Sequence, residues 1–127
     1  MSLATLLSDW LHKIESENLP SADITALNFG ILRSEKGYMI FLTGSEVYDA
    51  ADDDWAGEID YQPPRANKYL LLTAEINKTL KWTMVLELLA PALKEVITTE
   101  AAPQLFRNRT VTLGYDDEKL ILIKSGD

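Results

Sequence analysis

Two apolar segments joined by a short turn constrain the fold of this chain more than any other feature. Residues 24–33 and 38–47 are rich in β-branched and aromatic side chains, which favour strands. The residues between them, Ser34-Glu35-Lys36-Gly37, supply a turn and a glycine that can adopt positive φ. The pattern therefore predicts a β-hairpin. The side chains expected to share its core face are Leu27, Phe29, Ile31, Ile40 and Leu42.

Two other segments have helical periodicity. Residues 3–17 repeat apolar side chains at helical spacing behind Ser2, a good N-cap, and Pro20 follows as a stop signal. A second helical pattern starts at Ile76 and has two neighbouring apolar stripes, which predicts a central, buried helix. Pro91 lies inside it and removes one backbone donor, so we expect a kink or a break near Ala90.

The remaining apolar runs predict further strands. Residues 69–72 favour a short third strand, and residues 110–113 and 120–124 favour a second hairpin with a charged tip at 114–119. The 127 residues are 46% hydrophobic, which suits one domain spanning 1–127. We therefore predict a single α+β domain with an N-terminal helix and a long central helix kinked or broken near Pro91. Its antiparallel sheet has about five strands, built from two hairpins and a short strand.

The charge of the chain is concentrated between the first hairpin and the third strand. Residues 46–60 carry seven acidic side chains and no Lys or Arg, against a net charge of −8 for the whole chain. Residues 44–67 break every periodicity and contain glycines and prolines, so we expect a long ordered loop, a length that usually serves a purpose. Mutual repulsion among these carboxylates opposes folding, and a binding role would explain why the chain keeps them.

Several classes of chemistry lack support. The chain has no cysteine, which excludes disulfides, thiolate metal sites and a cysteine nucleophile. His12, the sole histidine, falls on the polar face of the first helix, and no serine lies in a G-x-S-x-G pattern. We therefore expect no catalytic residues and no enzyme activity. A carboxylate-based or metal-dependent enzyme remains a third hypothesis.

Asp52-Asp53-Asp54 followed by Gly57 superficially resembles a calcium-binding EF-hand loop. The register fails, because the fifth position is Ala56 and the twelfth, which needs a bidentate Glu, is Pro63. We expect no cofactor and no metal, with an irregular metal site left as an open alternative. The charged tip at Asp116-Asp117-Glu118 indicates only a solvated hairpin end.

The charge and hydropathy of the chain also restrict its partners. An acidic chain is a poor nucleic-acid binder, because phosphate contacts require clustered Lys and Arg. No run approaches the roughly 20 apolar residues of a membrane span. The N-terminal residues have no basic region and reach Asp9 early, unlike a signal peptide. We therefore predict a cytoplasmic protein with neither a nucleic-acid nor a membrane partner; its oligomeric state is left open.

Aromatic side chains interleave with the acids, which favours protein recognition: aromatics supply contact area and carboxylates pair with a basic partner. The predicted partner-binding residues are Glu46, Tyr48, Asp49, Asp52, Asp53, Asp54, Trp55, Glu58, Asp60 and Tyr61. In the alternative interpretation, the three aromatics fold back onto the sheet and anchor the loop, leaving the acids solvated. The acids could also mimic phosphates in the basic cleft of a nuclease.

The same loop carries a resemblance to a known group of proteins. Its motif consists of Gly44-Ser45, Tyr48, Asp53-Asp54-Trp55-Ala56, Asp60-Tyr61 and Pro63, followed by Tyr69-Leu70. This run resembles a pattern among small acidic immunity proteins, which bacteria encode beside polymorphic or contact-dependent toxins. The resemblance implies a non-enzymatic protein that binds a cognate toxin tightly and blocks its active site or activation. Together with the acidic charge, this leads us to predict a basic protein such as a toxin domain as the partner. The competing interpretation is a secretion chaperone or adaptor that binds through an apolar groove.

Overall fold

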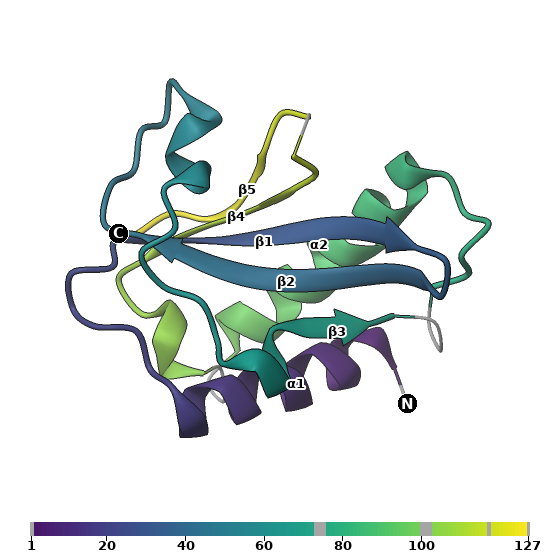
Figure 1. Ribbon diagram of the computed structural model, residues 1–127, viewed down its shortest axis with the longest axis horizontal. Coiled ribbons are helices and arrows are strands. Elements are labelled where there is room, and N and C mark those ends of the chain that lie inside the picture. The colour runs from purple at the N-terminus through teal and green to yellow at the C-terminus, as the bar shows by residue number, and fades with distance from the viewer. Residues whose placement is uncertain (1, 73–75, 100–102, 117, 127) are drawn as a thin grey trace.

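The computed structural model describes residues 2–72, 76–99, 103–116 and 118–126. Two α-helices and a five-stranded mixed sheet form an α+β fold, which confirms the predicted class (Figure 1). The strand order across the sheet is β3-β2-β1-β4-β5. The strands are β1 (Ala26–Ser34), β2 (Gly37–Ser45), β3 (Tyr69–Leu71), β4 (Thr110–Gly114) and β5 (Ile121–Lys124).

The sheet is built around the antiparallel pair of β1 and β2, which places Ile31 opposite Ile40. Gly37 at the turn has φ 129°, a conformation that L side chains rarely adopt. β3 adds to β2, and β5 to β4, in antiparallel register. β1 and β4 run parallel, however, so the expectation of an antiparallel sheet is wrong for this pair. The chain passes from β3 to β4, which run in the same direction, through a helix, the type of crossover that parallel strands need.

Helix α1 (Leu3–Glu17) has the predicted bounds, and the Ser2 hydroxyl accepts the backbone N–H of Thr5 at 3.1 Å. Helix α2 spans Trp82–Thr98 and therefore begins later than the expected Ile76. Asn77 accounts for the delay, because its side-chain oxygen accepts the Thr79 N–H at 2.9 Å and stabilises a turn instead. α2 runs through Pro91 as one helix, and the kink expected there remains a prediction.

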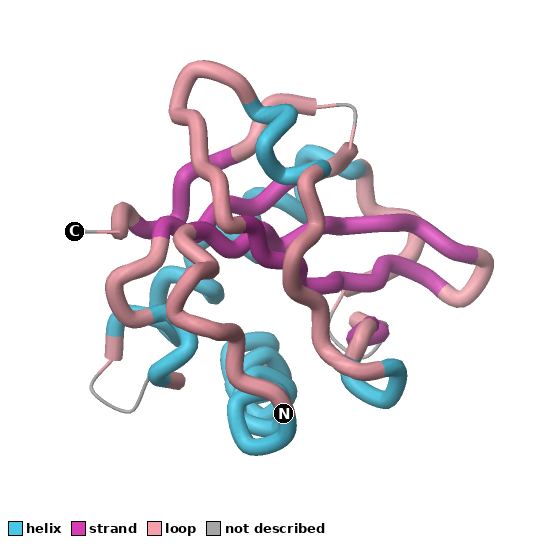
Figure 2. The backbone as a smooth tube through the Cα atoms, turned by 60° about the vertical axis from the view of Figure 1, so that its left-hand side comes forward, coloured by secondary structure: helices cyan, strands magenta, loops and turns pink. Residues whose placement is uncertain are grey.

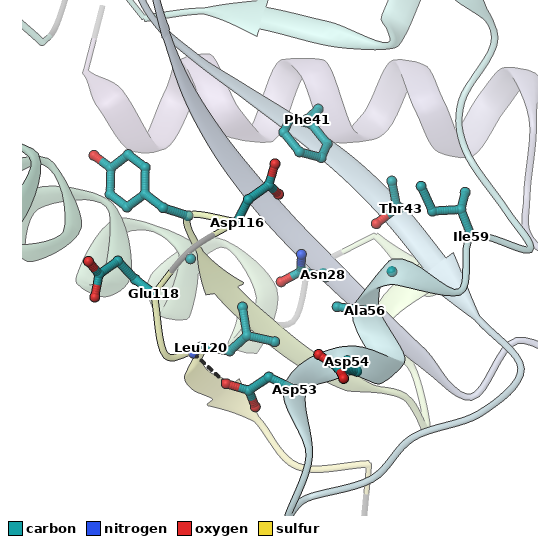
Figure 3. A pocket seen from close by; sticks show the side chains of 13 residues that line it. Asn28, Phe41, Thr43, Asp53, Asp54, Ala56, Ile59, Asp116, Glu118 and Leu120 are labelled. Atoms are coloured by element: carbon teal, nitrogen blue, oxygen red, sulfur yellow. Dashed lines mark hydrogen bonds between the residues drawn. The ribbon is translucent and has the colours of Figure 1, made fainter.

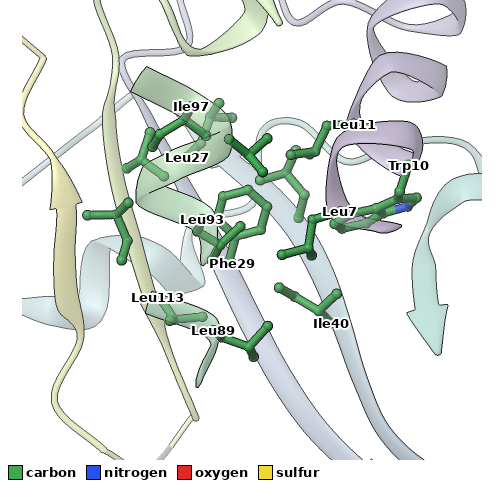
Figure 4. Packing of buried hydrophobic residues seen from close by; sticks show 14 of the residues in the cluster. Leu7, Trp10, Leu11, Leu27, Phe29, Ile40, Leu89, Leu93, Ile97 and Leu113 are labelled. Atoms are coloured by element: carbon green, nitrogen blue, oxygen red, sulfur yellow. The ribbon is translucent and has the colours of Figure 1, made fainter. Parts of the chain in front are cut away.

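Both helices pack against one face of the sheet and form a single apolar core with it (Figure 4). Phe29 is fully buried at its centre, with ring centroids 6.3 Å from Trp10 and 5.8 Å from Phe106. No α-helix formed by the described residues lies on the opposite face of the sheet. That face is partly covered by the segment between β2 and β3, which rises above the strands (Figures 1 and 2). The acidic residues therefore lie across the sheet from the main core.

Candidate functional site

The acidic segment, residues 46–60, is closed at its base. Gly44 and Tyr61 form an isolated antiparallel bridge, with the Gly44 N–H donating to Tyr61 at 2.8 Å and the Tyr61 N–H donating back at 3.1 Å. Gly44 is tightly enclosed there, because a Cβ would lie 2.8 Å from the Ile24 side chain. The segment thus leaves and rejoins the scaffold at one fixed point beside the end of β2.

Two of the three aromatics serve as anchors. Trp55 is 5% exposed and Tyr61 8% exposed, whereas Tyr48 is 38% exposed and meets the Trp55 ring edge-on at 5.2 Å. The Tyr61 hydroxyl donates to the carbonyl of Asn18 at 2.6 Å. Burial raises the pKa of Tyr61 to about 12, although the positive charge of Arg109 acts in the opposite direction. The anchoring interpretation therefore describes Trp55 and Tyr61, whereas part of the Tyr48 side chain stays exposed.

The seven carboxylates of the acidic segment divide into two groups by their hydrogen bonds. Four accept a backbone N–H at 2.9–3.0 Å: Asp49 from Ala51, Asp52 from Asp54, Asp53 from Leu120, and Asp60 from Glu46. Within the described residues, the side chains of Glu46, Asp54 and Glu58 accept no hydrogen bond. The first group shapes the segment, and the second presents its charge to solvent.

A cavity of about 430 Å³ lies on the open face of the sheet, between the acidic segment and the tip of the β4–β5 hairpin (Figure 3). Its floor comes from Asn28 on β1 and from Phe41 and Thr43 on β2. The short 3-10 helix η1 (Asp53–Gly57) supplies one wall with Asp53 and Asp54. The hairpin tip supplies the opposite wall with Asp116 and Glu118. We call this cavity the acidic pocket.

The acidic pocket is lined by carboxylates from two distant parts of the sequence, and no Lys or Arg is among its described lining residues. A hydrogen bond joins its walls, because the Leu120 N–H donates to the Asp53 carboxylate at 3.0 Å. Asp53 and Asp54 were predicted as site residues. Asp116 and Glu118 were not, since the sequence indicated only a solvated hairpin end; Asp117 lies outside the described residues. The parallel pairing of β1 with β4 brings the second wall into place.

The pocket floor is polar but enclosed. Asn28 is 8% exposed and accepts a hydrogen bond from the Thr112 hydroxyl at 2.8 Å, and Thr43 is 6% exposed. The Phe41 ring lies over Gly30, where a Cβ would sit 2.0 Å from its Cζ atom. Glycine at this position therefore lets Phe41 lie flat on the sheet as part of the floor. No sequence pattern had marked Asn28 or Thr43, which look like ordinary strand residues.

The part of the chain that the structure describes gives little support for a metal site, for a catalytic histidine or for a membrane-spanning helix. There, no three His, Asp or Glu side chains form a group that could hold a metal ion. The His12 ring contacts the Ser8 carbonyl at 2.8 Å on the exposed side of α1, the helix that packs on the other face of the sheet from the acidic pocket. None of the described helices is long and apolar enough to cross a membrane.

Comparisons with known proteins give no relative: no protein-family model, no curated protein and no solved structure matches this chain. The resemblance to immunity proteins thus rests on the motif residues alone.

Proposed function

We propose that this chain is a non-enzymatic protein-binding domain, an immunity-type inhibitor that neutralises a cognate toxin in the bacterial cytoplasm. The observation that carries the proposal is the pair of acidic walls, Asp53 with Asp54 and Asp116 with Glu118, which face one cavity that no described Lys or Arg lines. Carboxylates gathered in this way repel one another. A basic partner relieves the repulsion and is steered toward the site by the same field.

The anchoring of the acidic segment supports the same function. Trp55 and Tyr61 are buried, and Asp53 ties the segment to the hairpin, so the surface charges sit on a scaffold that is already folded. A preformed surface loses less conformational entropy on binding than a flexible acidic loop would. Of the ten predicted partner-binding residues, we assign direct contact to the exposed members, foremost Glu46, Tyr48, Asp54 and Glu58.

The test replaces acidic side chains that accept no hydrogen bond within the described residues. Replacing Glu46, Asp54 and Glu58 by Gln, Asn and Gln should lower affinity for the basic partner about tenfold at low salt, because three steering charges are lost. The salt dependence of binding should become shallower as well. Isothermal titration measures both, with the product of the adjoining reading frame or the protein that co-purifies from the native host as partner.

The matched control neutralises Glu35, Glu87 and Glu95, which are exposed and lie outside the acidic segment. It removes the same total charge and should leave affinity within about twofold of wild type. Equal affinities and equal salt slopes for the two triple variants would remove the acidic segment from the interface and refute the proposal.

A second candidate function, a secretion chaperone or adaptor, is favoured by one observation. Helix α2 exposes Met84 and Leu88, each at 42%, on one stripe, and Trp82 at 45% stands beside the Tyr115 ring at 5.7 Å. An apolar stripe of this kind is typical of a surface that meets another apolar surface. Light scattering separates the two functions: an obligate dimer that dissociates on Leu88→Asp favours the chaperone, and a monomer favours the inhibitor.

A further inference from the structure

We propose that the acidic pocket receives one arginine side chain from the protein partner, together with the peptide carbonyl beside it. This inference deepens the proposed function and rests on it. The carboxylates of both walls would pair with the guanidinium, while Thr43 and Asn28 on the floor would complete the hydrogen bonding.

The first argument comes from the floor of the pocket, where polar atoms lack protein partners. Thr43 is 6% exposed, and its hydroxyl makes no hydrogen bond with any described residue. Asn28 is 8% exposed; its Oδ1 atom accepts from Thr112, but its amide nitrogen has no partner in the described chain and faces the cavity (Figure 3). Among the described residues no fully buried side-chain N or O atom lacks a hydrogen-bond partner, so these two atoms are accessible from the cavity and free to bond to a ligand atom there.

The second argument concerns the charge and shape of that ligand. Carboxylates on both walls select a cation, and Phe41, Ile59 and Leu120 add apolar surface between them. A guanidinium suits this combination better than an ammonium, because it is planar and weakly hydrated and pairs with two carboxylates through its fork of donors. It can also stack on an aromatic ring such as Phe41.

The third argument concerns the atom that lies next to the cation. The Asn28 amide nitrogen can only donate, so it cannot bond to a guanidinium and requires an acceptor close by. A peptide carbonyl adjoining the arginine supplies that acceptor, which a free guanidine compound lacks. The volume of about 430 Å³ falls within the roughly 300–1,000 Å³ of ordinary ligand pockets and leaves room for both groups.

The experiment titrates ¹⁵N-labelled protein with the peptide acetyl-Gly-Arg-Gly-amide and follows the side-chain NH₂ resonances of Asn28. We expect saturable shifts there and at the backbone amides of Gly57 and Leu120. The citrulline peptide, which keeps the shape and loses the charge, should cause none. The lysine peptide and agmatine, a guanidine without a peptide carbonyl, should each bind at least about threefold more weakly.

Variants locate the binding in the pocket. Thr43→Val keeps the shape of the side chain and breaks no described protein hydrogen bond, so it should leave thermal stability unchanged. It should lower the affinity for the arginine peptide about three- to tenfold. The double variant Asp54→Asn with Glu118→Gln should lower that affinity tenfold or more. The control pair Glu87→Gln and Glu95→Gln should change nothing.

Three results would overturn the inference: no Asn28 shift at millimolar peptide, agmatine binding as tightly as the peptide, or unchanged peptide affinity in Thr43→Val. They are distinguishable from failure of the proposed function. If the Glu46, Asp54 and Glu58 variant loses partner affinity while Thr43→Val keeps it, the function stands and the arginine pocket is refuted. If the peptide binds but no partner shows acid-dependent affinity, the pocket stands and the function is refuted.

Discussion

Arg109→Met is expected to lower the free energy of unfolding by about 3 kcal/mol, the largest effect of any substitution considered, because several carbonyls lose a charged donor together. The Arg109 guanidinium donates to the carbonyls of Ile24 and Leu105, each at 2.8 Å, and of Ser21 at 2.9 Å. These bonds join the loop between α1 and β1 to the short 3-10 helix that precedes β4, through the residue just before β4. Burial lowers the pKa of Arg109 below its usual value, so the side chain is held in place by its bonds despite a cost in solvation.

Urea denaturation followed by circular dichroism measures this effect. Arg109→Lys should recover little of the loss. The guanidinium reaches three separate carbonyls with its planar fork of donors, and the compact ammonium of lysine has no such fork. Arg107→Met is the matched control: the exposed Arg107 side chain makes no hydrogen bond with any described residue, and its replacement should change stability by less than about 0.5 kcal/mol. Equal unfolding free energies for the Arg109 and Arg107 variants would contradict the role assigned to Arg109.

Tyr61→Phe should cost about 2 kcal/mol at neutral pH, because it removes the hydroxyl that donates to Asn18 at 2.6 Å and leaves that carbonyl unpaired. It should also change the response to alkali. Burial raises the folded-state pKa of Tyr61 from 10.0 to about 12, so the folded protein holds its proton where the unfolded chain loses it. The stability gained from this difference is complete below pH 10 and is lost as pH rises through about 12.

The measurement is a set of urea titrations between pH 9 and 12. Wild type should lose stability over this range more steeply than Tyr61→Phe. Some loss should persist in the variant, because burial and the neighbouring Tyr38 also raise the pKa of Tyr115 to about 12. Tyr48→Phe serves as control, since the Tyr48 hydroxyl makes no described hydrogen bond, and parallel pH curves for all three proteins would refute the anchoring role of Tyr61.

The parts of the fold that depend on residues close together in the sequence were predictable. The first helix is confirmed from Leu3 to Glu17, because its apolar spacing and its Ser2 cap act within a few residues. The pairing of β1 with β2 likewise follows from a short turn. The parallel contact between Ala26 and Thr110 joins segments far apart in the chain, and no local pattern encodes which way two such strands run.

The same distinction between local and long-range features applies to the candidate site. The density of acids in residues 46–60 identifies one wall of the pocket, because it is a local property of the sequence. The second wall at Glu118 and the floor at Asn28 and Thr43 become neighbours of that segment only through the order of the strands. The burial that separates Trp55 from Tyr48 is likewise a property of the folded chain, since both are aromatic residues in the same acidic context.

The docking of the acidic segment onto the β4–β5 hairpin is tested most directly by hydrogen exchange at the Leu120 amide, the donor to the Asp53 carboxylate. That amide should be protected in wild type and should lose protection in Asp53→Ala, with the amides of β1 unaffected. Asp54→Ala, which removes an equal charge from the next residue, should keep Leu120 protected. A Leu120 amide that exchanges as fast as an unstructured one in wild type would contradict the docked segment, and with it the two-walled pocket.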